Sequence, residues 1–214
     1  MPKLKPDTQR ARREHILDAA ERCFAEAGFH RTTMQDICRE AAISAGALYV
    51  YFSSKEDLIA GLCERDRAKL SRQLAGLAEA PDLMAALEAL GEYYAIEEPL
   101  HKRKLFVEIG AESTRNDAVG ETFRSVDRFV LESFESLFSR AKVEGRIAPT
   151  VEPAMLAQLL AVIGDGMFWR RAVDPNFDAK TVLPALTALI STLVNPLPPK
   201  HEDVRVAEAD EVSS

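Results

Sequence analysis

The sequence predicts an all-α protein, and three observations support this prediction. Apolar residues recur three and four positions apart along most of the 214-residue chain, as they do on one face of a helix. No stretch alternates apolar and polar residues over the length of a strand. Glycines and prolines, including Gly28, Gly145 and Pro175, separate the periodic segments. We therefore expect helices joined by short turns.

The first predicted helix runs from Thr8 to Ala27. Its apolar stripe includes Ile16, Leu17 and Phe24, and Gly28 follows where a left-handed residue ends many helices. The segment TMQD at 33–36 is a capping-box pattern, which predicts a second helix over 34–41.

Further helices follow along the rest of the chain. A short one is expected after Ser44, and another begins at Ser53 and Ser54. Longer helices are predicted at 82–97, 100–113, 117–144, 153–172 and 178–194. Residues 196–214 hold three prolines and five acidic against two basic residues, which predicts a disordered acidic tail.

The charge of the chain is unevenly distributed. The net charge is −7, but residues 1–70 hold 12 Lys and Arg against 11 Asp and Glu, whereas residues 71–214 hold 15 against 23. This distribution suits an N-terminal part that approaches phosphate and an acidic body that faces away.

The sequence gives no sign of a membrane span, a metal site or an enzyme. No apolar run approaches the roughly 18 residues that a span needs, and no apolar leader opens the chain. Cys23, Cys38 and Cys63 are scattered, as are the four histidines. No GxSxG, P-loop or GxGxxG motif is present. We expect a cytoplasmic protein that is not an enzyme and needs no metal or cofactor.

Residues 33–52 carry the most specific signal. Two short helices joined by a turn form the helix-turn-helix unit, whose second helix fits the major groove of DNA. The outward positions of that helix, Ser44–Ala47 and Tyr49–Tyr51, include two tyrosines and a serine but no charge. Such a face is unusual against water and suits contact with a duplex.

Two further residues fit this interpretation. Gly46 in the first turn of a helix costs up to about 1 kcal/mol relative to alanine, so it implies close approach to phosphate or tight packing on the first helix. Lys55 opens the fourth helix, where the helix dipole disfavours a cation. A phosphate bound by the ammonium and the helix amides would reverse that preference.

The residues around this unit resemble the N-terminal domain of TetR/AcrR transcriptional regulators. The resemblance covers roughly residues 10–60 and is carried by matching residues: Thr33, Asp36, Ile37, Ser44, Gly46, Leu48, Tyr49, Tyr51, Phe52, Ser54 and Lys55. It implies an all-helical homodimer with a three-helix DNA-binding domain and a larger helical domain for ligand binding and dimerisation. We expect these domains at 8–55 and 56–195.

The resemblance also implies which residues contact DNA. Thr33, Tyr49 and Lys55 would contact phosphates, and Ser44, Ala45, Gly46, Ala47, Val50 and Tyr51 would line the base edges. Gln35 is a further candidate for a base contact, and Arg10 and Arg13 for contacts beside the unit.

Two positions depart from the family pattern. Ala42 stands where the family usually has glycine, so a left-handed turn there would be mildly strained. The recognition helix also has no Arg, Lys, Asn or Gln, the side chains that read bases with paired hydrogen bonds. Readout of DNA shape is therefore expected to matter.

Two helices of the larger domain are apolar on more than one face. Residues 153–172 and 182–194 would pair with their symmetry mates in a four-helix dimer contact. The interface candidates are Leu156, Leu160, Ile163, Met167, Leu183, Leu186, Ile190 and Leu193. The stretch 163–169 also resembles the DGLW segment of the BetI-like branch of the family.

A small-molecule pocket is expected among the middle helices. Its candidate residues are Tyr93, Tyr94, Phe106, Ile109, Phe123, Phe134, Asp165, Phe168 and Trp169. The alternative interpretation of each aromatic residue is that it is an ordinary core residue. Asp165, on an apolar helix, could bind a cationic ligand, cap a neighbouring helix, or pair with Arg170 or Arg171.

The leading hypothesis is a repressor that a small lipophilic or aromatic inducer releases from a pseudo-palindromic DNA operator. The alternatives are a small-molecule carrier with a silent DNA-binding domain, an activator, or a regulator without a ligand.

Overall fold

A computed structural model describes residues 6–198 of the chain. Over these residues the regular structure is helical, and the sole β-type pairing is an isolated bridge between Ile147 and Pro196. The predicted all-α fold is therefore confirmed. No helix within this part of the chain is long and apolar enough to cross a membrane.

The helix boundaries agree closely with the predictions. The elements are α1 (Pro6–Ala27), α2 (Met34–Glu40), α3 (Ala45–Tyr49), α4 (Lys55–Glu79), α5 (Leu83–Glu92), η1 (Tyr93–Glu97), α6 (Leu100–Glu112), α7 (Asp117–Val143), α8 (Pro153–Val173) and α9 (Ala179–Val194).

Short polar side chains set most of these starts. Thr33 and Asp36 form the predicted capping box at α2, and Ser44 caps α3 by accepting a hydrogen bond from the Ala47 amide at 3.2 Å. Gly28 follows α1 with φ +82°, so the expected left-handed ending is also observed.

The predicted helix over 82–97 is interrupted. The regular α5 ends at Glu92, and Tyr93–Glu97 form a single wide π-helical turn, in which the Glu98 amide donates to the Tyr93 carbonyl at 2.8 Å. A π turn admits an extra residue into the helix and often accompanies a binding site. Apolar periodicity does not distinguish it from an α-helix.

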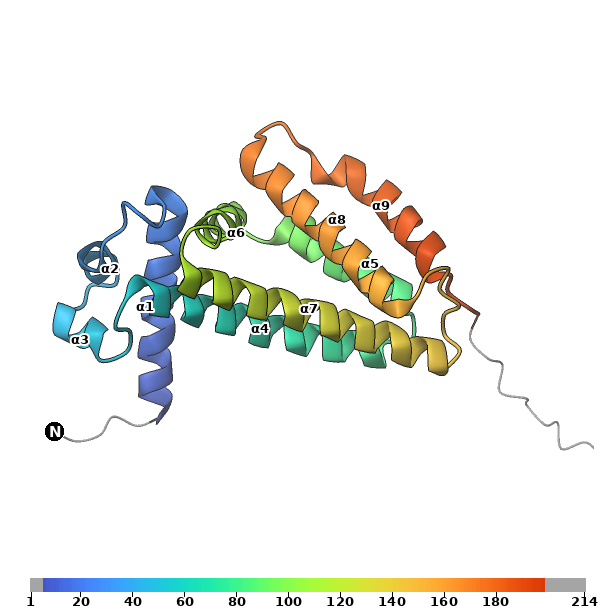
Figure 1. Ribbon diagram of the computed structural model, residues 1–214, viewed down its shortest axis with the longest axis horizontal. Coiled ribbons are helices and arrows are strands. Elements are labelled where there is room, and N and C mark those ends of the chain that lie inside the picture. The colour runs from blue at the N-terminus through green and yellow to red at the C-terminus, as the bar shows by residue number, and fades with distance from the viewer. Residues whose placement is uncertain (1–5, 199–214) are drawn as a thin grey trace, which may run out of the picture.

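The helices surround two main cores. One is formed by α1–α3, the first turns of α4 and part of α6; we call α1–α3 with those turns the head. The other is formed by the rest of α4 with α5, α7, α8 and α9; together with α6 they make up the body. Figure 1 shows the head at one end, α4 and α7 side by side along the long axis, and α8 and α9 on one side of them.

Only residues 196–198 of the predicted disordered tail lie in the described part of the chain. Residues 199–214 lie outside the described part of the chain. The start of the tail is held, because the Leu197 amide donates to the Arg146 carbonyl at 2.8 Å beside the bridge at Pro196. Disorder from residue 196 onward was therefore the wrong expectation for these first positions.

Candidate nucleic-acid interface and internal cavity

The α2–α3 unit is fixed from below by fully buried side chains. Leu48 of α3 and Ile37 of α2 are both 0% exposed and belong to the head core. The turn between the helices passes through Ala42 at φ +51°, the left-handed conformation that the sequence led us to expect. The backbone of the unit is therefore positioned by packing rather than by a permissive glycine.

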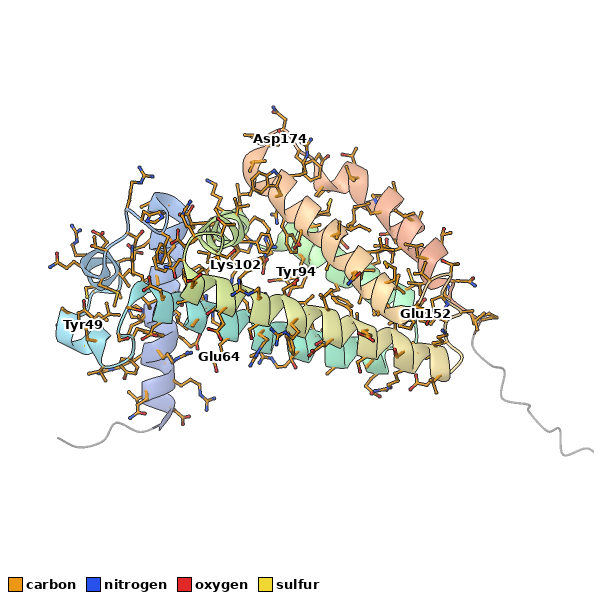
Figure 2. All side chains as sticks on the ribbon, viewed as in Figure 1. Tyr49, Glu64, Tyr94, Lys102, Glu152 and Asp174 are labelled. Carbon is orange, nitrogen blue, oxygen red and sulfur yellow. The ribbon has the colours of Figure 1, made fainter. Side chains whose placement is uncertain are left out.

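The opposite face of α3 is open. Tyr49 is 55% exposed and Val50 is 78% exposed, and Ser44, Ala45 and Gly46 are exposed beside them. Figure 2 shows Tyr49 at the outer end of the head, away from the body. A methyl group added at Gly46 would meet no atom within 4 Å, so packing against α1 does not explain this glycine.

Two of the predicted base-edge residues are less accessible. Ala47 and Tyr51 are half-buried, and Tyr51 packs against the head core. Gln35 of α2 is exposed.

The residues predicted to contact phosphate differ in how far their polar groups are already engaged within the protein. Thr33 already serves as the cap of α2, with its hydroxyl 2.6 Å from Asp36 Oδ2. The Lys55 ammonium donates to the Phe29 carbonyl and lies 4.2 Å from the centre of the Phe29 ring. This contact offsets the unfavourable dipole position and leaves further N–H donors of the ammonium available.

The two arginines of α1 also differ. Arg10 is exposed. Arg13 turns back onto the protein, where its Nη2 is 2.9 Å from Glu64 Oε2 and its guanidinium lies 5.3 Å from the Phe52 ring centre. In this arrangement Arg13 braces α1 against α4, so a DNA contact would require its rearrangement.

The body encloses a cavity of about 340 Å³, lined by side chains of every helix from α4 to α9. The predicted ligand residues that line it are Tyr94, Phe106, Ile109, Phe123, Phe134, Asp165 and Phe168. Tyr93 and Trp169 do not. Tyr93 points instead to the Lys69 ammonium, and Trp169 is 54% exposed on the outside. Adjacent helical residues point in different directions, and here only Tyr94 of the two tyrosines is turned to the cavity.

Sequence reasoning missed the buried charges of the cavity. Glu98, just after η1, is 3% exposed, and Arg103 of α6 is 6% exposed; the two form an ion pair at the cavity wall. The Arg103 guanidinium also lies 4.0 Å from the Phe168 ring centre. Burial and the nearby charge of Arg171 lower the pKa of Arg103 to about 10. The sequence hardly indicates that these two residues are buried, because charged residues on helices are usually exposed to water.

Two of the three alternatives considered for Asp165 are not observed among the described residues. Arg170 lies 3.6 Å from Asp174, and Arg171 donates to the Ile96 carbonyl at 2.7 Å, so neither pairs with Asp165. Asp165 caps no described helix and faces the cavity within α8. Burial and the neighbouring Asp127 raise its pKa above the ordinary value.

The predicted interface residues lie on the inner faces of α8 and α9. Leu156 is 0% exposed and Met167 is buried, while Leu160, Ile163, Leu183, Leu186, Ile190 and Leu193 are half-buried in the two body clusters. Leu156 and Met167 are covered by their own chain, whereas the six half-buried residues keep part of their surface exposed, so the contact predicted for them stays a prediction. The outer face carries Met155, Val162, Trp169, Val173 and Leu189, all at least 48% exposed.

An ion-pair network joins the cavity wall to the head. Glu21 of α1 is buried, and its carboxylate is 3.2 Å from the Lys102 ammonium and 2.6 Å from His101 Nε2, both on α6. Lys102 also lines the cavity and lies 3.2 Å from Asp66 of α4. Figure 2 shows Lys102 beside α6, on the head side of Tyr94.

The pKa of Glu21 reflects this surrounding. Burial alone would raise it, but Lys102, with His101 and Arg65, outweighs burial and lowers it below the ordinary value. Glu21 is therefore held ionised where head and body meet.

The fixed α2–α3 unit with its open outer face defines the chain as a helix-turn-helix protein. Comparisons with known proteins agree. The sequence pattern of bacterial regulatory proteins of the tetR family matches residues 16–62. The HTH-type transcriptional regulator UidR of Escherichia coli (strain K12) is 33% identical over 152 residues, which cover 69% of this chain and 75% of UidR.

Solved structures share the fold over most of the chain. Salmonella enterica GusR matches with a TM-score of 0.72 at 31% identity, covering 86% of this chain and 95% of GusR. SmeT in its complex with triclosan matches with a TM-score of 0.69 at 25% identity, covering 88% of this chain and 99% of SmeT. The chain belongs to the tetR family of DNA-binding transcriptional regulators, as the resemblance in its sequence implied.

Proposed function

We propose that this regulator is a homodimeric repressor whose affinity for a DNA operator falls when a small apolar molecule enters the body cavity. The observation that carries the DNA-binding part is the open face of α3 above the fully buried Leu48. A recognition helix needs both a fixed backbone and an accessible outer face. Ser44–Gly46, Tyr49 and Val50 would lie in the major groove, and Tyr49, Thr33 and Lys55 would contact phosphates.

The outer face of α8 and α9 supports the homodimer. Met155, Leu159, Val162, Trp169 and Val173 are spaced three, four or seven residues apart along α8, which places them on one stripe. An exposed apolar stripe of this length on a soluble chain is typical of an interface. Two copies meeting there would place two heads on successive major grooves, about 34 Å apart.

The network at Glu21 supports ligand control. Lys102 contacts both the cavity and Glu21 of the head, so a ligand that shifts α6 also changes how α1 is held. A coupling of about 1–3 kcal/mol would change operator affinity roughly 5- to 150-fold. SmeT, a relative of this chain, was solved in complex with triclosan.

The DNA-binding part is tested by fluorescence anisotropy with DNA from upstream of the protein's own gene. Lys55→Ala should weaken binding about tenfold and reduce the salt dependence by about one phosphate contact. Tyr49→Phe should weaken it less, since only a hydroxyl is lost. Lys180→Ala, at an exposed position in the first turn of α9 in the body, is the matched control and should leave affinity unchanged.

The carrier alternative predicts the opposite result. A small-molecule carrier whose head does not bind DNA would show no DNA affinity, so Lys55→Ala would have no effect on it. Equal affinities for the wild type, Lys55→Ala and Lys180→Ala would contradict the proposed interface.

A further inference from the structure

One side chain in the cavity wall has an unmet hydrogen-bonding group. Arg103 is 6% exposed and lines the cavity, yet its Nε has no hydrogen-bond partner among the described residues. Its ion pair with Glu98 uses Nη2, and its guanidinium carbon lies 4.0 Å from the centre of the Phe168 ring. A buried donor of a charged group is costly to leave unmet, so this position favours an acceptor.

The charges around Arg103 indicate which acceptor fits. Glu98 is shared, because the Lys69 ammonium lies 3.5 Å from its other oxygen. Arg171 is close enough for its charge to affect Arg103, and its own Nη1 is buried without a hydrogen-bond partner. Asp66, also in the wall, is engaged by Lys102 at 3.2 Å. Two cations, Arg103 and Lys69, therefore share the buried carboxylate of Glu98 with Arg171 nearby, and an additional anion would be stabilised there.

The rest of the wall sets the shape of the ligand. Phe106 lies 6.0 Å from Phe123 and 5.4 Å from Phe168 between ring centres, and Phe134 and Ile109 continue the apolar lining. An apolar or aryl body would bury its surface against these side chains.

We infer that the cavity binds an amphipathic carboxylate, with its aryl or alkyl body among the phenylalanines and its carboxylate on Arg103. This inference rests on the proposed ligand control and specifies the chemistry of that same site. A guanidinium matches a carboxylate in shape as well as in charge, since its neighbouring N–H groups face two oxygens together.

Two other lining residues favour a ligand of the opposite charge. Asp127 and Asp165 line the cavity and form no ion pair with any described residue, so they would favour a cationic ligand. Both aspartates are exposed to water, although the surrounding protein partly desolvates Asp165, whereas Arg103 is buried. Water can satisfy the two aspartates but not Arg103, which makes the arginine the stronger determinant of ligand charge.

Isothermal titration calorimetry with three probes of the same shape tests the inference. The probes are 4-(2-naphthyl)butanoate, its primary amide and the corresponding primary amine. The full-length protein should bind the acid at least about tenfold more tightly than the amide, with the amine weakest. Tighter binding of the amide or amine, or no binding of any probe at millimolar concentration, would overturn the inference.

Two variants with effects of opposite sign separate a ligand contact from a structural role. Arg103→Gln should abolish the preference for acid over amide. Glu98→Gln should tighten binding of the acid, because it removes the resident counter-ion of Arg103. If both variants weaken the acid alike, or neither alters the preference, the assignment to Arg103 fails.

Glu135→Gln, at an exposed position of α7 outside the cavity lining, is the charge control and should preserve the preference for the acid. DNA affinity of each variant, measured without a probe, reports on the proposed repressor function separately. A protein that binds DNA but prefers the amine would contradict only the ligand class.

Discussion

The head and the body use similar apolar residues in different ways. In the head, Leu17, Ile37 and Leu48 are 0% exposed and fill the space between the helices. In the body, large side chains such as Phe106 and Phe123 line a cavity of about 340 Å³. A reading surface for DNA needs a backbone that does not move, whereas a small-molecule site needs volume. The tightly packed head therefore suits DNA binding, and the body with its cavity suits small-molecule binding.

The largest expected difference is in the cost of removing a leucine. Leu17→Ala should lower the free energy of unfolding by about 2–5 kcal/mol, because Leu17 is enclosed in the head core. Leu183→Ala should cost about 1 kcal/mol, because Leu183 already faces the cavity. Urea unfolding followed by circular dichroism gives both values. Equal losses would mean that the body is packed as tightly as the head.

A second prediction concerns the outer face of α8. Val162 is 69% exposed, so Val162→Glu should leave the fold of a single chain intact but place charges opposite each other in the proposed dimer. Sedimentation velocity should show a shift from dimer to monomer. Val143→Glu on α7 makes the same substitution at an exposed site and should leave the dimer unchanged. A dimer that tolerates Val162→Glu would use another surface.

The third prediction tests the junction between the two regions. Because the pKa of Glu21 is lowered in the folded chain, its stabilising effect is complete above the ordinary carboxyl pKa of about 4.3 and is lost as the pH falls through the lowered value. Glu21→Gln should therefore be less stable at neutral pH and lose less stability between neutral and acidic pH. Thermal unfolding over this pH range is the measurement, and parallel curves for both proteins would contradict the role of Glu21.

The smallest effect is expected in the turn of the head. Ala42→Gly relieves the left-handed strain at φ +51°, which exceeds the extra backbone entropy that glycine brings to the unfolded chain. The net gain should be about 0.5–1 kcal/mol in the free energy of unfolding. Ala45→Gly, at an exposed helical position with ordinary backbone angles, should instead lose stability.

The sequence predicted the head more fully than the body. Thr33, Ser44 and Gly28 act through local chemistry, so the ends of their helices can be inferred from a few neighbouring residues. The orientation of the Arg13 side chain could not be inferred in this way, because its contacts with Glu64 and Phe52 depend on how α1 meets α4.

In the body, periodicity identified the helices but not the direction of each face. Residues 153–173 are apolar almost all round, so the pattern could not separate the inner Leu156 from the outer Val162. The burial of Glu98 and Arg103 depends on how the π turn, α6 and α8 meet, and no local pattern encodes it.

The central claim is that the open face of α3 reads DNA. The most direct measurement is the affinity of the wild-type protein for DNA from upstream of its own gene and for a shuffled duplex of the same length and composition. At physiological salt we expect nanomolar binding of the first, at least about 10³-fold tighter than that of the second. Equal affinities for the two duplexes, or no binding below about 1 µM, would contradict the account.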